Sequence, residues 1–94
     1  MSNITLKKKI ISKNINIGII GIGYVGLPLA ISFSKKNYNK IIGFEKNKFI
    51  IEKIKKNISP ISYIKSKEIK KLNSNFKITN QIKYISNADV IIIC

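Results

Sequence analysis

The sequence predicts an α/β fold with a doubly wound parallel sheet, and three observations lead to this fold class. Short runs rich in isoleucine alternate with longer segments in which apolar residues recur at helical spacing. The resulting order is β-α-β-α-α-β-α-β, and strands that alternate with helices form parallel sheets. Hydrophobic residues make up 45% of the 94 residues, as in folded globular proteins.

The first predicted unit is a strand followed by a helix. Residues 1–14 form a polar, lysine-bearing lead-in that we expect to be loose, so the folded domain spans residues 15–94. The strand covers residues 16–20, which are short, rich in isoleucine and ended by glycine. The helix covers residues 24–36, with Pro28 in its first turn, where a missing N–H is tolerated. Its expected apolar positions are Val25, Leu29, Ile31 and Phe33.

The second unit repeats this pattern, with a strand at residues 40–44 and a helix that continues to Lys56. Asn47 is the expected N-cap, because its side-chain oxygen can accept a backbone N–H. Asn57 is expected to end the helix in the left-handed conformation. The expected apolar face of this helix consists of Phe49, Ile50, Ile51 and Ile54.

The remaining elements are shorter. They are a loop around Pro60, a helix at residues 65–72, a strand at 76–79, a helical turn at 81–86 and a strand at 88–94. We expect both faces of this parallel sheet to be covered. Because the chain stops inside its most hydrophobic strand, we expect it to be a fragment, with Cys94 as a small buried side chain.

Composition limits the possible functions. The net charge is +14, from 18 basic and 4 acidic residues, and a basic surface can bind nucleic acid. All the basic residues are dispersed lysines, however, and arginine is the side chain that reads phosphate bidentately. We therefore expect a solvated surface and no nucleic acid. The single cysteine, the absence of a secretory signal and the lack of a long apolar run favour a cytoplasmic protein with no membrane span.

Three glycines follow the first predicted strand. Gly21, Gly23 and Gly26 form a G-x-G-x-x-G pattern between a strand and a helix, which is the context in which this pattern binds dinucleotides. Gly21 would make the tight turn, Gly23 would let the backbone approach a diphosphate, and Gly26 would let the helix pack on the strand. The alternative is a tight turn with no ligand.

An acidic residue stands at the second position that dinucleotide binding requires. Glu45 directly follows the second strand, where a carboxylate bonds the ribose hydroxyls and repels a 2′-phosphate. The cofactor predicted from this pair of signals is NAD. Tyr24 either contacts the dinucleotide or fills the helix start. The sequence contains no histidine, and we expect neither a metal site nor a catalytic residue.

These residues resemble a known family. The segments "IGIIGIGYVGLPLA", "IIGFEKN", "IEKIKKNISPI" and "ADVIIIC" are similar to the N-terminal, Rossmann-type NAD-binding domain of the UDP-glucose/GDP-mannose dehydrogenase family. The similarity covers residues 16–94 and is closer to bacterial UDP-N-acetyl-hexosamine 6-dehydrogenases, of which "GYVGLPLA" is typical. Glu45 stands where the family usually has Asp, and Ile50 stands where it often has a basic residue.

The resemblance implies an enzyme that oxidises the C6 alcohol of a UDP-sugar to a uronate for surface polysaccharide, with homo-oligomeric full-length members. It implies that the diphosphate is held by Gly21, Gly23, Tyr24, Val25 and Gly26, and the adenosine ribose by Glu45. The family's catalytic cysteine and sugar-nucleotide domain lie beyond this chain, so we expect the chain alone to be inactive. Two alternatives stay open: an NAD-linked β-hydroxyacid-type dehydrogenase, or a non-catalytic basic binding module.

Overall fold

Four parallel strands form a single sheet in the order β3-β2-β1-β4. The computed structural model describes residues 14–36, 38–72 and 75–94, so nearly all of the predicted lead-in lies outside the described residues. The strands are β1 (Asn16–Ile20), β2 (Lys40–Phe44), β3 (Phe76–Thr79) and β4 (Val90–Ile93). This order is that of the first part of a Rossmann-type sheet, which confirms the predicted fold class.

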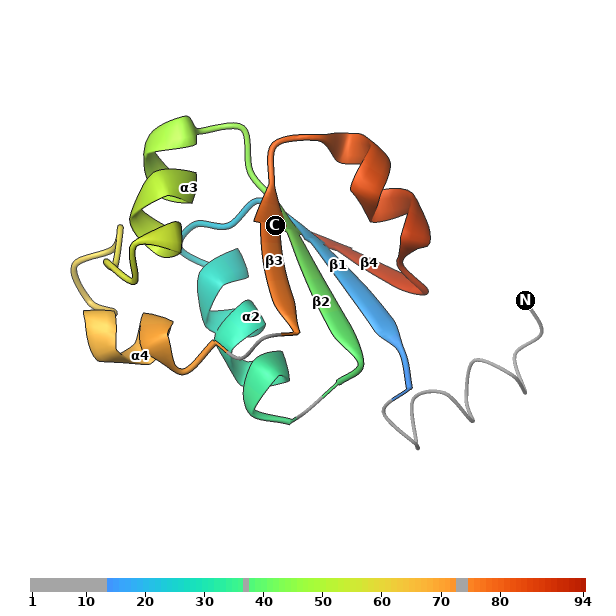
Figure 1. The fold of residues 1–94 in the computed structure, drawn as a ribbon, viewed down its shortest axis with the longest axis horizontal. Helices are drawn as coiled ribbons and strands as arrows, with labels where there is room; N and C mark the ends of the chain where they lie inside the picture. Colours follow the sequence, from blue (N-terminus) through green and yellow to red (C-terminus); the bar gives the residue numbers. More distant parts are fainter. Residues whose placement is uncertain (1–13, 37, 73–74) are drawn as a thin grey trace.

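Three α-helices cover one face of the sheet, and a short 3-10 helix lies on the other (Figure 1). They are α2 (Gly26–Lys35), α3 (Lys48–Lys55), α4 (Ser66–Lys70) and the 3-10 helix η1 (Ile82–Asn87). The main core lies under the three α-helices. Its centre is formed by Ile17, Ile19 and Ile41 of the strands with Leu27, Ile54 and Ile69 of the helices. No helix within the described residues is long and apolar enough to span a bilayer.

The second face of the sheet is covered only in part. Ile42 and Phe44 of β2 are buried there against Ile85 of η1. On β4, however, Ile91 is 48% exposed and Ile93 is 77% exposed. The expectation that both faces are covered is therefore wrong at β4, because η1 is a single short helix that packs over β1 and β2.

The start of α2 differs from the prediction by two residues. The helix begins at Gly26, and Tyr24 and Val25 belong to the preceding turn. Val25, an expected apolar position of the helix, is 61% exposed, and Leu27 is fully buried. Pro28 has no N–H to donate to the carbonyl of Tyr24, so consecutive helical hydrogen bonds begin only with the one from Leu29 to Val25.

The ends of α3 follow from local side-chain chemistry. The side chain of Asn47 accepts a 2.9 Å hydrogen bond from the N–H of Phe49, as an N-cap does. Asn57 has a φ of 59° and ends the helix in the left-handed conformation, as predicted.

Phe49 of α3 is 62% exposed and is not part of the apolar face of this helix. The ammonium of Lys53 lies 4.6 Å from the centre of its ring, which gives the aromatic face a cationic partner in solvent.

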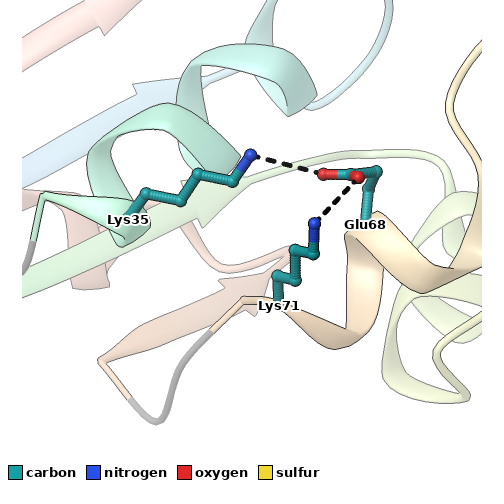
Figure 2. A network of polar contacts seen from close by, with 3 residues as sticks. All are labelled: Lys35, Glu68 and Lys71. Carbon is teal, nitrogen blue, oxygen red and sulfur yellow. Dashed lines mark hydrogen bonds and ion pairs between the residues drawn. The ribbon is translucent and has the colours of Figure 1, made fainter.

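One carboxylate ties α4 to α2. Glu68 accepts a 3.4 Å hydrogen bond from Lys35 at the end of α2 and a 3.2 Å hydrogen bond from Lys71 (Figure 2). The hydrogen bond from Lys71, supported by Lys35, holds the pKa of Glu68 below its ordinary value.

Candidate functional site

All the predicted binding residues line one pocket at the carboxyl ends of the strands. The pocket has a volume of about 290 Å³, and its walls are formed by Gly21, Gly23, Tyr24, Val25, Gly26, Glu45 and Cys94. Larger hollows of about 410 and 490 Å³ lie along β3, away from the glycine turn. Ligands of open α/β sheets bind outside the carboxyl ends of the strands, so the smaller pocket is the candidate site.

Each glycine of the turn meets a different steric requirement. Gly21 has a φ of +94°, a left-handed conformation that favours glycine, and a Cβ there would lie 2.9 Å from the carbonyl oxygen of Cys94. A Cβ on Gly26 would overlap the carbonyl oxygen of Gly21, so the start of α2 can approach the end of β1 only without a side chain. A Cβ on Gly23 would meet no atom within 4 Å. The space beside Gly23 is therefore open to a ligand.

The helix start beside this space carries unpaired donors. Within the described residues, no hydrogen bond is formed by the backbone N–H groups of Gly23, Tyr24, Val25 or Gly26. No side chain caps α2, and its first turn contains no acidic residue. Unpaired N–H groups at a helix N-terminus attract anions. The arrangement suits the diphosphate of a dinucleotide.

The carboxylate of Glu45 connects the end of β2 to the glycine turn. Its Oε1 accepts a 3.0 Å hydrogen bond from the N–H of Ile22, and its Oε2 accepts a 2.8 Å hydrogen bond from the N–H of Asn47. A carboxylate has about four acceptor positions. Glu45 can therefore accept ribose hydroxyl donors while it keeps both backbone hydrogen bonds.

The side chain of Ile22 and the glycine beneath it were not predicted. Ile22 is fully buried, and a Cβ on Gly43 would lie 2.8 Å from its Cδ1 atom. Gly43 in β2 thus leaves room for Ile22, which anchors the turn in the core. A glycine inside a strand is a sequence signal for such a close approach.

The position of Cys94 corrects a prediction. Its side chain is exposed, although the sequence indicated a buried one. The strand ends at Ile93, and Cys94 lies beyond it at the wall of the pocket, next to Gly21. Among residues 14–36, 38–72 and 75–94, no three potential metal-ligating side chains lie together.

Several relatives and solved structures are similar to this chain. It is 38% identical over 80 residues to Protein CapL of Staphylococcus aureus, covering 85% of this chain and 18% of that protein. It is 30% identical over 81 residues to the UDP-N-acetyl-D-glucosamine 6-dehydrogenase of Pseudomonas aeruginosa, with 86% and 18% covered. The structure of the NDP-N-acetyl-D-galactosaminuronic acid dehydrogenase from Methanosarcina mazei Go1 has a TM-score of 0.79 and 27% identity, with 100% of this chain and 22% of that one covered.

The chain spans about a fifth of the length of these relatives. Residues 15–94 match the NAD-binding domain of the UDP-glucose/GDP-mannose dehydrogenase family. The parallel sheet with its interleaved helices agrees with this match, and NAD is the cofactor of the domain. The chain belongs to the UDP-glucose/GDP-mannose dehydrogenase family.

Proposed function

We propose that this chain is the N-terminal NAD-binding part of a UDP-sugar 6-dehydrogenase that acts on a UDP-N-acetyl-hexosamine in the synthesis of surface polysaccharide. The observation that carries the proposal is the uncapped start of α2, whose unpaired N–H groups share one pocket with the carboxylate of Glu45. The names of the relatives support the substrate class, because one of them is a UDP-N-acetyl-D-glucosamine 6-dehydrogenase.

Each site residue has a role in this proposal. The backbone N–H groups at the start of α2 bind the diphosphate, and the small residues of the turn let it come close to the backbone. The residues of this turn are Gly21, Gly23, Tyr24, Val25 and Gly26. Glu45 accepts hydrogen bonds from the adenosine ribose and disfavours a 2′-phosphate by charge. When bound, NAD supplies the acceptor for the hydride that leaves C6 of the sugar.

The catalytic groups belong to the rest of the enzyme. Oxidation of an alcohol to a carboxylate transfers two hydrides in succession to two NAD molecules, takes its second oxygen from water, and needs groups that move the released protons. The sequence contains no histidine, and Cys94 is the only cysteine. We therefore expect a sugar-nucleotide domain outside these residues, a homo-oligomeric enzyme and a cytoplasmic location, where NAD and UDP-sugars occur together.

The experiment that tests the proposal has two stages. NAD and NADP are first titrated into the purified protein, and we expect NAD to bind more tightly. The protein as its own cell produces it is then assayed with UDP-N-acetylglucosamine, UDP-N-acetylgalactosamine, UDP-N-acetylmannosamine and UDP-glucose, and NADH formation is followed. A protein that binds no NAD contradicts the binding role. Activity only on β-hydroxyacids, or only salt-sensitive binding of RNA, would replace the proposed function with one of the two alternatives.

A further inference from the structure

One backbone carbonyl in the glycine turn lacks its usual helical partner. At the start of α2, the N–H of Leu27 donates to the carbonyl of Gly23 at 3.1 Å, and the N–H of Leu29 donates to the carbonyl of Val25 at 3.3 Å. The carbonyl between these two belongs to Tyr24. Its donor would be the N–H of residue 28, and Pro28 has none.

The missing donor comes from a residue far away in the sequence. The hydroxyl of Tyr63, in the loop between α3 and α4, donates a 2.5 Å hydrogen bond to the carbonyl oxygen of Tyr24. The two rings also stack, with their centroids 5.8 Å apart and an interplanar angle of 23°. Hydrogen bond and stack together fix the relative position of the loop and the turn.

The loop that carries Tyr63 is itself held in place. The side chains of Ile61 and Ile64, on either side of Tyr63, are buried in the main core. The N–H of Ser59 donates to the hydroxyl of Ser66 at 3.0 Å, which closes the loop onto the start of α4. Tyr63 therefore projects from an anchored segment toward the turn.

We propose that Tyr63 is a positioning residue for the NAD site, acting through the peptide bond between Tyr24 and Val25. This inference rests on the proposed function. In a trans peptide the carbonyl and the N–H of the next residue point in opposite directions. By holding the carbonyl of Tyr24, Tyr63 fixes the direction of the N–H of Val25, which is one of the unpaired donors of the pocket. The loop between α3 and α4 thus pre-organises the diphosphate site.

The proline provides the test of this mechanism. Tyr63→Phe removes the hydroxyl and keeps the ring, and loss of one hydrogen bond predicts about threefold to tenfold weaker NAD binding. Pro28→Ala supplies the missing N–H within the helix. In the Pro28→Ala background, Tyr63→Phe should therefore change the NAD affinity by less than about twofold. A matched control is Tyr84→Phe, because Tyr84 is an exposed tyrosine of η1 that does not line the pocket.

The affinity of each variant is measured by titration with NAD, and circular dichroism checks that each is folded. A wild-type protein that does not bind NAD overturns the proposed function. A wild type that binds NAD with the same affinity as Tyr63→Phe overturns the inference alone. If Tyr63→Phe weakens NAD binding equally in the wild-type and Pro28→Ala backgrounds, the inference is also overturned, because Tyr63 then does not act through the carbonyl of Tyr24. If Tyr63→Phe alone does not fold, the double variant Pro28→Ala/Tyr63→Phe is compared with Pro28→Ala. Equal NAD affinities of these two proteins support the inference, and clearly weaker binding by the double variant overturns it.

Discussion

The backbone N–H of Ile22 donates a 3.0 Å hydrogen bond to Oε1 of Glu45. The proposed ribose acceptor is thereby bonded to the turn that is proposed to hold the diphosphate. The other oxygen of the same carboxylate accepts the N–H of Asn47, the N-cap of α3. The two ends of the adenosine diphosphate site therefore form one hydrogen-bonded unit, and a change at Glu45 should affect both.

The first prediction concerns Glu45→Gln. The variant loses the negative charge. Its amide has one acceptor oxygen where the carboxylate has two, so only one of the N–H groups of Ile22 and Asn47 keeps its acceptor. Hydrogen bonds to charged groups contribute about 1.5–3 kcal/mol, which predicts about tenfold to 100-fold weaker NAD binding. NADP should lose less affinity, because the repulsion of its 2′-phosphate is removed as well.

Titration of both cofactors into Glu45→Gln measures this change of preference. Glu52→Gln is the matched control, because Glu52 is an exposed carboxylate on α3 that does not line the pocket. We expect the control to bind like the wild type. An unchanged ratio of NAD to NADP affinity in Glu45→Gln would show that the carboxylate does not read the ribose.

The second prediction is that Gly23→Val abolishes NAD binding and leaves the fold intact. A Cβ at Gly23 meets no atom within 4 Å, so the protein can accept a side chain there. The free energy of unfolding should change by less than about 0.5 kcal/mol, as for a surface substitution. The valine would occupy the space that the diphosphate needs. Urea unfolding and NAD titration measure the stability and the NAD affinity of Gly23→Val. Ser32→Val, on the exposed side of α2, is the control. Full NAD affinity in Gly23→Val would show that the diphosphate does not lie beside Gly23.

The third prediction is that Gly26→Ala destabilises the fold itself. The new Cβ would overlap the carbonyl oxygen of Gly21 and lie 3.3 Å from Cγ2 of Ile19 in the core. Either the start of α2 or the end of β1 must move, and overpacking of this kind costs about 1–3 kcal/mol. Urea unfolding measures the loss. Ser32→Ala on the same helix provides the control for helix propensity, and equal stability of the two variants would contradict the close approach.

Local chemistry explains which parts of this fold could be predicted. The bounds of β1, β2 and β3 match those predicted, because isoleucine-rich runs and breaking residues define them within a few positions. Asn47 and Asn57 were predicted as caps for the same reason, since a cap depends on its own side chain and the adjacent backbone. The G-x-G-x-x-G spacing and Glu45 likewise predicted residues that share one pocket.

The errors concern features that depend on distant parts of the chain. Val25, Phe49 and Cys94 are apolar or nearly so, yet each is exposed, because no other element packs over it. The contact between Tyr24 and Tyr63 joins residues far apart in the sequence. Pro28 does signal that the carbonyl of Tyr24 needs another donor, but only the packing of the loop identifies that donor.

The last prediction concerns pH and the ion pairs of Glu68. The hydrogen bond from Lys71, supported by Lys35, holds the pKa of Glu68 in the folded protein below its ordinary value. Between these two pKa values Glu68 is protonated in the unfolded chain and still charged in the native one, so the unfolded chain binds more protons. Stability contributed by Glu68 should therefore be present at neutral pH and lost as the pH falls through the lowered pKa of the folded state.

Urea unfolding of the wild type and of Glu68→Gln at a series of pH values measures this difference. The free energies of unfolding of the two proteins should converge in acid. Because Glu68 joins α2 to α4, the difference between them at neutral pH measures the contribution of this helix contact (Figure 2). Lys67→Gln, on the same helix but outside the network, should leave that pH dependence unchanged, and a gap of constant size at every pH would contradict the assignment.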